Sequence, residues 1–199
     1  MSDGRATASS RWALAALAAL LAGSLAPAQP SDTQSPDPAL RRLLVDAVND
    51  AESFRDRFDA EVWLVDMSTR LSRKLPDTKE RLELLKLVHA EAARVDLAPE
   101  LVLAVIDVES NFDRYAISSA GARGLMQIMP FWLDEIGRPD DNLFKVPTNL
   151  RYGCTILRYY YDMEKGDLIR ALARYNGSLG RRTYPYKVLD RLRSRWYRL

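Results

Sequence analysis

The sequence contains one cysteine and one histidine among its 199 residues, and each scarcity excludes a class of site. Because Cys154 is the only cysteine, no disulfide bond can form within the chain. Because His89 is the only histidine, a metal site built from several histidines is excluded, and we expect neither a metal nor another cofactor. The formal net charge of +2 is too small to indicate nucleic acid as a partner.

The sequence also lacks runs in which polar and apolar residues alternate strictly, which is the pattern typical of half-buried strands. Its apolar residues instead recur at the three- and four-residue spacing of amphipathic helices. We therefore predict a mostly α-helical protein, with a loop over 113–124. The predicted helices are 40–58, 62–71, 77–95, 99–111, one from Leu125 that bends or restarts at Pro130, 148–165, 167–175 and 184–197.

The N-terminal residues have the features of an export signal. Arg5 and Arg11 precede an apolar stretch, Trp12 to Leu25, which is short for a membrane span. Ala26-Pro27-Ala28 then fits the small-x-small rule for cleavage, so we predict a signal peptide over residues 1–28 and a periplasmic location. No cysteine follows the apolar stretch, so a lipoprotein is not expected. An uncleaved N-terminal anchor is the alternative interpretation.

Composition divides the remaining chain into three parts. Residues 29–38 hold three prolines among polar residues, which indicates a linker. Residues 39–75 are predicted to form an N-terminal helical extension, and residues 76–199 a catalytic domain. The extension carries a dense apolar group, Trp63 to Met67, which favours packing onto the domain as a brace. Binding of a partner from the cell-wall machinery through residues 39–75 is the alternative.

Glu109 is the acidic residue that the pattern of the helix 99–111 singles out. This helix is apolar nearly all round, which is typical of a buried helix. Burial, the negative end of the helix dipole and repulsion from Asp113 are each expected to raise the pKa of Glu109. A protonated carboxyl group near neutral pH suits the cleavage of a glycosidic bond, since the leaving oxygen needs a proton. The alternatives are a solvent-facing Glu109 and the rival acid Asp107, which we interpret as a structural ion pair.

A set of short motifs follows in a fixed order. Glu109-Ser110 begins it, Ser118 lies nine residues after the glutamate, and residues 121–127 read Gly-Ala-Arg-Gly-Leu-Met-Gln. Tyr175-Asn176 completes the set. Over about residues 80–199, the order and spacing strongly resemble the catalytic domain of the soluble lytic transglycosylases. These are lysozyme-like enzymes that cleave peptidoglycan, so the resemblance implies a lysozyme-like helical domain, related to goose-type lysozyme.

The resemblance also implies a role for each matching position. Glu109 would be the sole catalytic acid and then the base. The residues implied to line the substrate groove are Ser118, Gln127, Met129, Tyr175 and Asn176. Ser118 and Gln127 would bind the sugar or orient Glu109, while Tyr175 would hold the catalytic carboxyl group or stack on sugar. Arg174 and the segment 177–184 depart from the family pattern and leave the far end of the groove undefined.

The implied reaction is cleavage of the β-1,4 bond between N-acetylmuramic acid and N-acetylglucosamine in peptidoglycan glycan strands. It would leave a 1,6-anhydro end on the muramic acid, which makes the enzyme a lyase. A hydrolytic muramidase on the same fold is the first alternative, because spacing alone does not separate it from a lyase. A catalytically dead module that binds the cell wall is the second, and the intact Glu109 argues against it.

Overall fold

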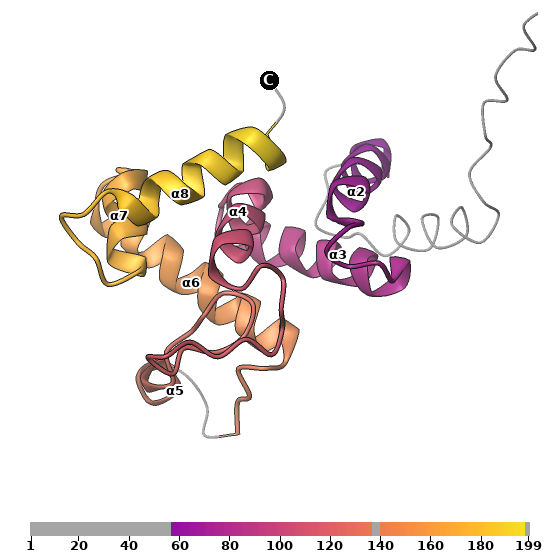
Figure 1. Ribbon diagram of the computed structural model, residues 1–199. Helices are drawn as coiled ribbons and strands as arrows, with labels where there is room; N and C mark the ends of the chain where they lie inside the picture. The colour runs from indigo at the N-terminus through magenta and orange to yellow at the C-terminus, as the bar shows by residue number, and fades with distance from the viewer. Residues whose placement is uncertain (1–56, 137–139, 198–199) are drawn as a thin grey trace, which may run out of the picture. The chain divides into compact units, whose positions relative to one another are not determined.

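The computed structural model describes residues 57–136 and 140–197, and this part of the chain is mostly helical, with a long loop over residues 110–130 (Figure 1). It contains no strand, only isolated antiparallel bridges that join Arg123 to Ile117 and to Ile128. The prediction of a mostly α-helical protein is therefore confirmed. The helices are α2 (Arg57–Leu71), α3 (Thr78–Arg94), α4 (Pro99–Glu109), α5 (Phe131–Ile136), α6 (Val146–Met163), α7 (Leu168–Tyr175), α8 (Thr183–Arg191) and the π-helix η1 (Leu192–Trp196).

Several predictions for the N-terminal part lie outside the described residues. They are the signal peptide over 1–28, the linker over 29–38 and most of the helix over 40–58. None of the helices in the described part of the chain combines the length and the apolar character that a membrane crossing requires.

Helix α4 is the buried helix around which the described part of the domain is built. Residues 101–107 of α4 are all buried, and Leu103 and Ile106 are completely inaccessible. Pro99 occupies the first turn, where its missing N–H group costs no helical hydrogen bond. Helix α4 packs against α3, α8 and η1 (Figure 1). This packing fixes the position of Glu109, the last residue of the helix.

Two helix starts were predicted correctly from their capping residues. The side chain of Asp77 accepts a hydrogen bond of 2.7 Å from the backbone N–H of Glu80 at the start of α3. The side chain of Asp167 accepts one of 3.0 Å from the N–H of Arg170 at the start of α7. Each cap satisfies a backbone donor that the helix leaves unpaired, typically a contribution of about 1 kcal/mol.

The helix of the N-terminal extension starts earlier than predicted, but it packs onto the domain as predicted. The predicted start at Val62 is wrong, because residues 57–61 already belong to α2 (Arg57–Leu71). No glycine or proline interrupts residues 57–62, so nothing in the sequence ends one helix there and begins another. The inner side of α2 buries Leu64, Met67 and Leu71 in the common core, and α2 packs against α3 and η1. The described residues of the extension thus pack as a brace.

The predicted helix from Leu125 is wrong before Pro130, whereas the predicted restart at Pro130 is confirmed. Residues 124–127 form a turn, and the next helix, α5, begins at Phe131, directly after Pro130. Gln127 has a φ of 49°, which an α-helix cannot accommodate. The backbone N–H groups of Arg123 and Ile128 donate to each other's carbonyl oxygens, at 2.9 and 3.0 Å. This hairpin-like exchange takes up the groups that a helix would use.

Candidate active site

Glu109 and Tyr184 form the central contact of the candidate site. Glu109 ends α4 and is partly buried, while Tyr184 lies in the first turn of α8 and is 8% exposed. The hydroxyl group of Tyr184 donates a hydrogen bond of 2.6 Å to Oε1 of Glu109. Because α4 and α8 pack directly on each other, this contact follows from the core of the domain.

The surroundings of Glu109 raise its pKa from 4.5 to about 7. Burial is the main cause, because it disfavours the charged carboxylate, and the hydrogen bond from Tyr184 acts in the opposite direction. The expected repulsion from Asp113 is not a cause. Helix α4 ends at Glu109, so Asp113 does not lie one helical turn further on, and its carboxylate accepts a hydrogen bond from the N–H of Tyr115.

Tyr175 lies close to this pair but contacts a different group. Its hydroxyl group donates a hydrogen bond of 2.7 Å to the carbonyl oxygen of Met126. Burial and the nearby charge of Glu109 raise the pKa of Tyr175 well above its usual value, so the phenol stays neutral. The hydroxyl group that contacts Glu109 therefore belongs to Tyr184 and not to Tyr175. Tyr184 was missed from the sequence, although its four-residue spacing to Val188 already placed it on the apolar side of the last helix.

Ser118 and Gln127 both hold the loop that precedes α5. The hydroxyl oxygen of Ser118 accepts a hydrogen bond of 3.0 Å from the N–H of Ala122. The side-chain amide of Gln127 donates to the carbonyl oxygens of Ala116 and Gly124, at 3.2 and 2.9 Å. These contacts shape the loop, and no hydrogen bond between described residues joins either side chain to Glu109.

The other two predicted residues have fewer contacts. Met129 is partly buried, and its carbonyl oxygen accepts a hydrogen bond from the N–H of Trp132 at 3.1 Å. Asn176 is exposed at the end of α7, where its N–H group donates to the carbonyl oxygen of Leu172. Its side chain makes no hydrogen bond within the described ranges, so its position follows from α7 alone.

Asn149 is a second residue that the sequence reasoning missed. It is 1% exposed in the first turn of α6, and its side chain makes two hydrogen bonds to the loop that precedes α5 and one to the segment between α5 and α6. Its oxygen accepts from the N–H of Met126 at 2.8 Å, and its nitrogen donates to Leu143 and Arg123 at 2.8 and 2.9 Å. The carbonyl group that Tyr175 contacts therefore belongs to a residue held by Asn149. The hydrogen-bond partners of Asn149 lie in other segments, so no local pattern predicts them. The one available signal is that an asparagine is rarely buried unless its side chain is hydrogen-bonded.

Gly124 belongs to the same arrangement. Its φ is +74°, a conformation that glycine adopts at little cost. An added Cβ atom would lie 2.5 Å from the carbonyl oxygen of Leu143 and would also collide with the side chain of Asn149. The close approach of α6 and the loop therefore requires glycine at this position.

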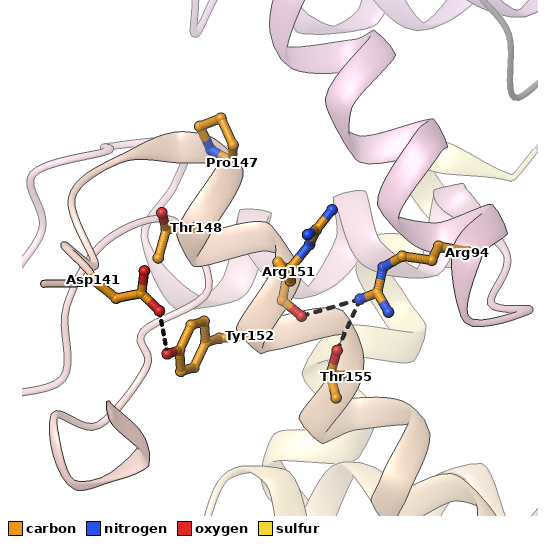
Figure 2. A pocket seen from close by; sticks show the side chains of 7 residues that line it. All are labelled: Arg94, Asp141, Pro147, Thr148, Arg151, Tyr152 and Thr155. Carbon is orange, nitrogen blue, oxygen red and sulfur yellow. Dashed lines mark hydrogen bonds between the residues drawn. The ribbon is translucent and has the colours of Figure 1, made fainter. Parts of the chain in front are cut away.

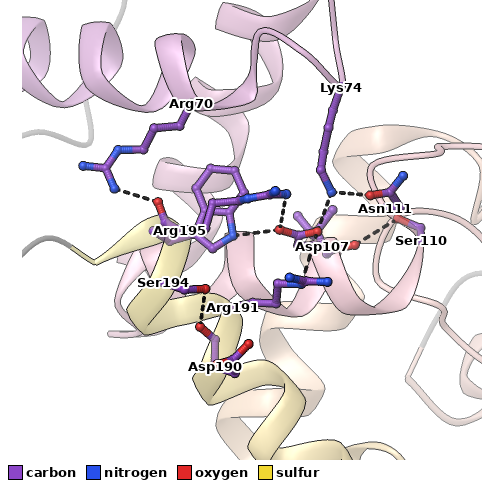
Figure 3. A network of polar contacts seen from close by, with 11 residues as sticks. Arg70, Lys74, Asp107, Ser110, Asn111, Asp190, Arg191, Ser194 and Arg195 are labelled. Atoms are coloured by element: carbon purple, nitrogen blue, oxygen red, sulfur yellow. Dashed lines mark hydrogen bonds and ion pairs between the residues drawn. The ribbon is translucent and has the colours of Figure 1, made fainter.

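Asp107 is a structural ion pair, as predicted (Figure 3). Its side chain is 2% exposed, and the carboxylate accepts hydrogen bonds from Lys74 at 2.5 Å and from Arg195 and Trp196 at 3.2 Å each. Arg191 lies 4.0 Å from the same group. All capacity of this carboxylate is used within the fold. In residues 57–136 and 140–197, no three histidine, cysteine, aspartate or glutamate side chains are grouped as a metal site would need.

A separate open pocket of about 510 Å³ lies between α3 and α6 (Figure 2). None of the predicted site residues lines it. Its two arginines, Arg94 and Arg151, both pair with Glu91, at 2.6 and 2.8 Å. Tyr152 on another side of the pocket donates a hydrogen bond of 2.6 Å to Asp141. These polar groups are already satisfied by one another, so we assign this pocket no ligand.

The sequence of this domain matches a known family over residues 86–187, which include Glu109, the loop and both tyrosines. The family is described as Transglycosylase SLT domain. The chain belongs to this family. The matched range begins within α3 and ends within α8, so it includes the packed elements that position Glu109. The family match and the helical architecture agree with the predicted lysozyme-like class.

Individual relatives of this SLT-domain chain are similar over parts of their length. The transglycosylase of Enterobacteria phage PRD1 is 31% identical over 112 residues, which cover 53% of this chain and 41% of the phage protein. Membrane-bound lytic murein transglycosylase C of Actinobacillus pleuropneumoniae is 48% identical over 46 residues, covering 23% of this chain and 13% of the relative. The chain thus spans less than half of the curated relatives it matches.

One solved structure is similar over more of the chain. The 70 kDa soluble lytic transglycosylase of Escherichia coli has a TM-score of 0.40 and is 21% identical. The similarity covers 79% of this chain and 32% of the other.

Proposed function

We propose that this chain is a peptidoglycan lytic transglycosylase with Glu109 as its acid and then its base. The family supports the reaction class, since the relatives matched by the chain are named transglycosylases. The observation that carries the proposal is the pKa of Glu109, which is raised to about 7. At that value both the acid and its conjugate base are accessible near neutral pH, which a two-step proton transfer by one group requires.

In the first step, protonated Glu109 gives its proton to the glycosidic oxygen between N-acetylmuramic acid and N-acetylglucosamine. The bond to that oxygen breaks, and the N-acetyl group of the muramic acid stabilises the positive charge at the anomeric carbon. Burial of Glu109 favours this step because it keeps the carboxyl group protonated. The hydrogen bond from Tyr184 orients the carboxyl group, so Tyr184 is a positioning residue.

In the second step, ionised Glu109 takes the proton from the C6 hydroxyl group of the same muramic acid. The C6 oxygen then bonds to the anomeric carbon and closes the 1,6-anhydro ring without water. The hydrogen bond from Tyr184 stabilises the carboxylate at this stage, because it favours the charged form. Glu109 ends the cycle protonated, and no second acid is consumed.

The surroundings of the other acidic residues near the loop support a mechanism with a single carboxyl group. Hydrolytic glycosidases pair two carboxyl groups, one for the leaving oxygen and one for water or the sugar. Here the carboxylates of Asp113 and Asp141 accept hydrogen bonds from Tyr115 and Tyr152. Asp134 and Asp140 are exposed. These contacts leave Glu109 as the acid that supports the proposal.

The predicted groove residues and domains belong to the same proposal. Gln127, Ser118 and Met129 would line the groove from the loop, and Tyr175 and Asn176 from α7. Residues 76–199 would form the catalytic domain, braced by residues 39–75 and exported to the periplasm by a signal peptide over 1–28. The tight loop supports this arrangement, since a groove wall needs a fixed backbone.

The deciding experiment is mass spectrometry of the products released from purified sacculi by the wild-type chain and by Glu109→Gln. The substitution keeps the size of the side chain and an oxygen that can accept a hydrogen bond from Tyr184. It removes the acidic proton that the reaction requires. We expect 1,6-anhydro products from the wild type, lighter by one water and resistant to borohydride reduction. We expect Glu109→Gln to bind sacculi and to release at least about 10³-fold less product.

Other outcomes would contradict the proposal at different points. Reducible ends would identify a hydrolase and require a second carboxyl group that activates water. Normal product release by Glu109→Gln would show that Glu109 is not the acid. Binding of sacculi without any product from the wild-type chain would identify a binding module.

A further inference from the structure

A second pocket, of about 780 Å³, lies between α2 and η1 and is lined by four arginines. Arg70 lies in the last turn of α2, and Arg73 lies two residues beyond the end of this helix. Arg193 and Arg195 belong to η1. None of the residues proposed to act in the reaction lines this pocket. The function of this pocket is therefore a separate question from the cleavage of glycan.

Two of the four arginines fix the walls of the pocket (Figure 3). Arg70 donates two hydrogen bonds to Asp66, at 2.7 and 2.8 Å, and a third of 2.6 Å to the carbonyl oxygen of Arg195. Arg195 in turn donates to the buried carboxylate of Asp107 at 3.2 Å. These contacts join α2 to η1 and to α4, so the pocket is preformed rather than created by a ligand.

The other two arginines have no partner of opposite charge in the described part of the chain. Arg73 and Arg193 are exposed, and neither makes a hydrogen bond or an ion pair with a described residue. The neighbourhood also has more positive than negative charge, because Asp107 alone faces three cations. The nearby carboxylates are those of Asp66, Asp107 and Asp190. The nearby cations are six, namely Arg70, Arg73, Lys74, Arg191, Arg193 and Arg195.

We propose that this pocket binds a phosphate group through Arg73 and Arg193. The guanidinium group presents paired donors that match phosphate oxygens, and a phosphate can carry two negative charges where a carboxylate carries one. The aliphatic hydroxyl groups of Thr69, Ser72 and Ser194 already donate to backbone carbonyl oxygens, so among the neutral side chains of the pocket wall the phenol hydroxyl group of Tyr197 is left as a donor. The arginines therefore attract the anion. The excess positive charge of the pocket favours a phosphate over the less highly charged carboxylate.

The phosphate can be free or part of a lipid headgroup, and the outward face of α2 makes the lipid form a specific case to test. Phe58, Val62 and Val65 are 72%, 52% and 41% exposed, and Thr69 at the pocket follows them at helical spacing. Exposed apolar residues beside basic ones are typical of surfaces that contact anionic membranes. Three acidic residues also flank this face. Asp59 and Glu61 lie about 12 Å or more along the helix from the pocket, and Asp66 lies nearer but is paired with Arg70.

The test compares the wild-type chain with Arg73→Gln/Arg193→Gln in two assays at low ionic strength, where screening is weak. The first is calorimetric titration with inorganic phosphate, with acetate as the competing carboxylate. The second is sedimentation with vesicles of phosphatidylcholine, with and without phosphatidylglycerol. Only the difference between the two kinds of vesicle counts, because the apolar stretch of residues 12–25 contributes to both. The matched control, Lys145→Gln/Lys165→Gln, removes two charges at the ends of α6.

We expect phosphate binding to weaken by at least about tenfold in the arginine variant and to stay unchanged in the control. An effect in the vesicle assay alone would assign the phosphate to a lipid headgroup, and an effect with inorganic phosphate alone to a free phosphate. Equal binding by wild type and arginine variant in both assays would overturn the proposal. So would acetate binding as tightly as phosphate. Both arginines are exposed and unpaired, so an unchanged melting temperature is expected of the variant.

Discussion

Tyr184 reaches Glu109 across 75 positions of the chain and donates a hydrogen bond of 2.6 Å to its carboxylate. The contact has two opposing consequences for the acid. Burial by the packed helices raises the pKa of Glu109, while the hydrogen bond lowers it, and the result is a value of about 7. The two effects can be separated by experiment, because substitution of Tyr184 removes one and keeps most of the other.

We predict that Tyr184→Phe moves the alkaline fall of kcat/KM to higher pH. In the wild type this fall is expected near pH 7, where Glu109 loses the proton that it must donate. Without the phenol hydroxyl group the charged form loses its hydrogen bond, so the pKa of Glu109 rises further. We also expect kcat to fall by about tenfold, because the carboxyl group is less well oriented.

Tyr186→Phe is the matched control for this measurement. Tyr186 lies two residues further along α8, is 49% exposed and has its hydroxyl group near Arg182, at 3.3 Å. Its pH profile should match that of the wild type. A profile that shifts equally in both variants, or a shift of Tyr184→Phe to lower pH, would contradict the role assigned to Tyr184.

A second prediction concerns stability and follows from the same pKa. In the unfolded chain Glu109 ionises near pH 4.5, but in the folded chain only near pH 7. Between these values the folded state binds more protons than the unfolded state, so the free energy of unfolding falls as the pH rises. The loss amounts to at most about 3 kcal/mol. Glutamine does not titrate, so Glu109→Gln does not lose this stability. The free energy of unfolding of the variant minus that of the wild type should therefore rise by up to about 3 kcal/mol from pH 4 to pH 8.

Urea unfolding of both proteins at pH 4 and pH 8 measures this difference. Parallel changes of the two unfolding free energies with pH would mean that Glu109 has an ordinary pKa. They would also remove the main support for its role as the acid. The comparison needs no substrate, so it tests the acid independently of the reaction.

The elements that local sequence determines were predicted well. Helix α4 was recognised from its continuous apolar character, and its burial is the reason that the expected rise in the pKa of Glu109 is found. The caps Asp77 and Asp167 were recognised because a cap bonds to a donor only three residues away. In each case the interacting groups lie within one or two helical turns, so the pattern contains the information.

The features that depend on distant partners were not predicted. The apolar residues from Leu125 onward fit a helix in the sequence. Residues 124–127 nevertheless form a turn, which Asn149 holds from 23 positions away through the N–H of Met126. Tyr175 was expected either to hold the carboxyl group of Glu109 or to stack on sugar, and the hydroxyl group that contacts Glu109 is that of Tyr184. Which tyrosine reaches the carboxyl group depends on how α7 and α8 pack, and no short-range pattern records that packing.

The third prediction concerns the carboxylate of Asp107, which holds α4 against η1. Asp107→Ala should lower the free energy of unfolding by about 3–5 kcal/mol, because Lys74 and Arg195 then lose a buried partner. Asp66→Ala is the matched control, since the Asp66–Arg70 pair is more exposed and should cost less than about 1 kcal/mol. Thermal and urea unfolding measure both. A similar small loss in the two variants would show that the buried network does not brace the domain.

The fourth prediction links the stability of the loop to activity through Asn149. Asn149→Ala leaves the N–H of Met126 and the carbonyl oxygen of Leu143 without their partner inside the fold, while the carbonyl oxygen of Arg123 keeps the N–H of Ile128. Since each unpaired buried group costs about 1–3 kcal/mol, we expect the free energy of unfolding to fall by about 2 kcal/mol or more. Activity on sacculi should fall as well, at a temperature where the variant is still folded, because Met126 carries the acceptor of Tyr175.

Asn142→Ala provides the control, because Asn142 is exposed and its side chain accepts one hydrogen bond, from the N–H of Phe144 at 2.8 Å. It should cost about 1 kcal/mol or less and leave activity unchanged. Asn149→Asp tests the direction of the hydrogen bonds, since it can still accept from Met126 but cannot donate to the two carbonyl groups. Its stability should lie between those of the wild type and Asn149→Ala. Full activity in a folded Asn149→Ala would show that the position of the loop backbone does not limit the reaction.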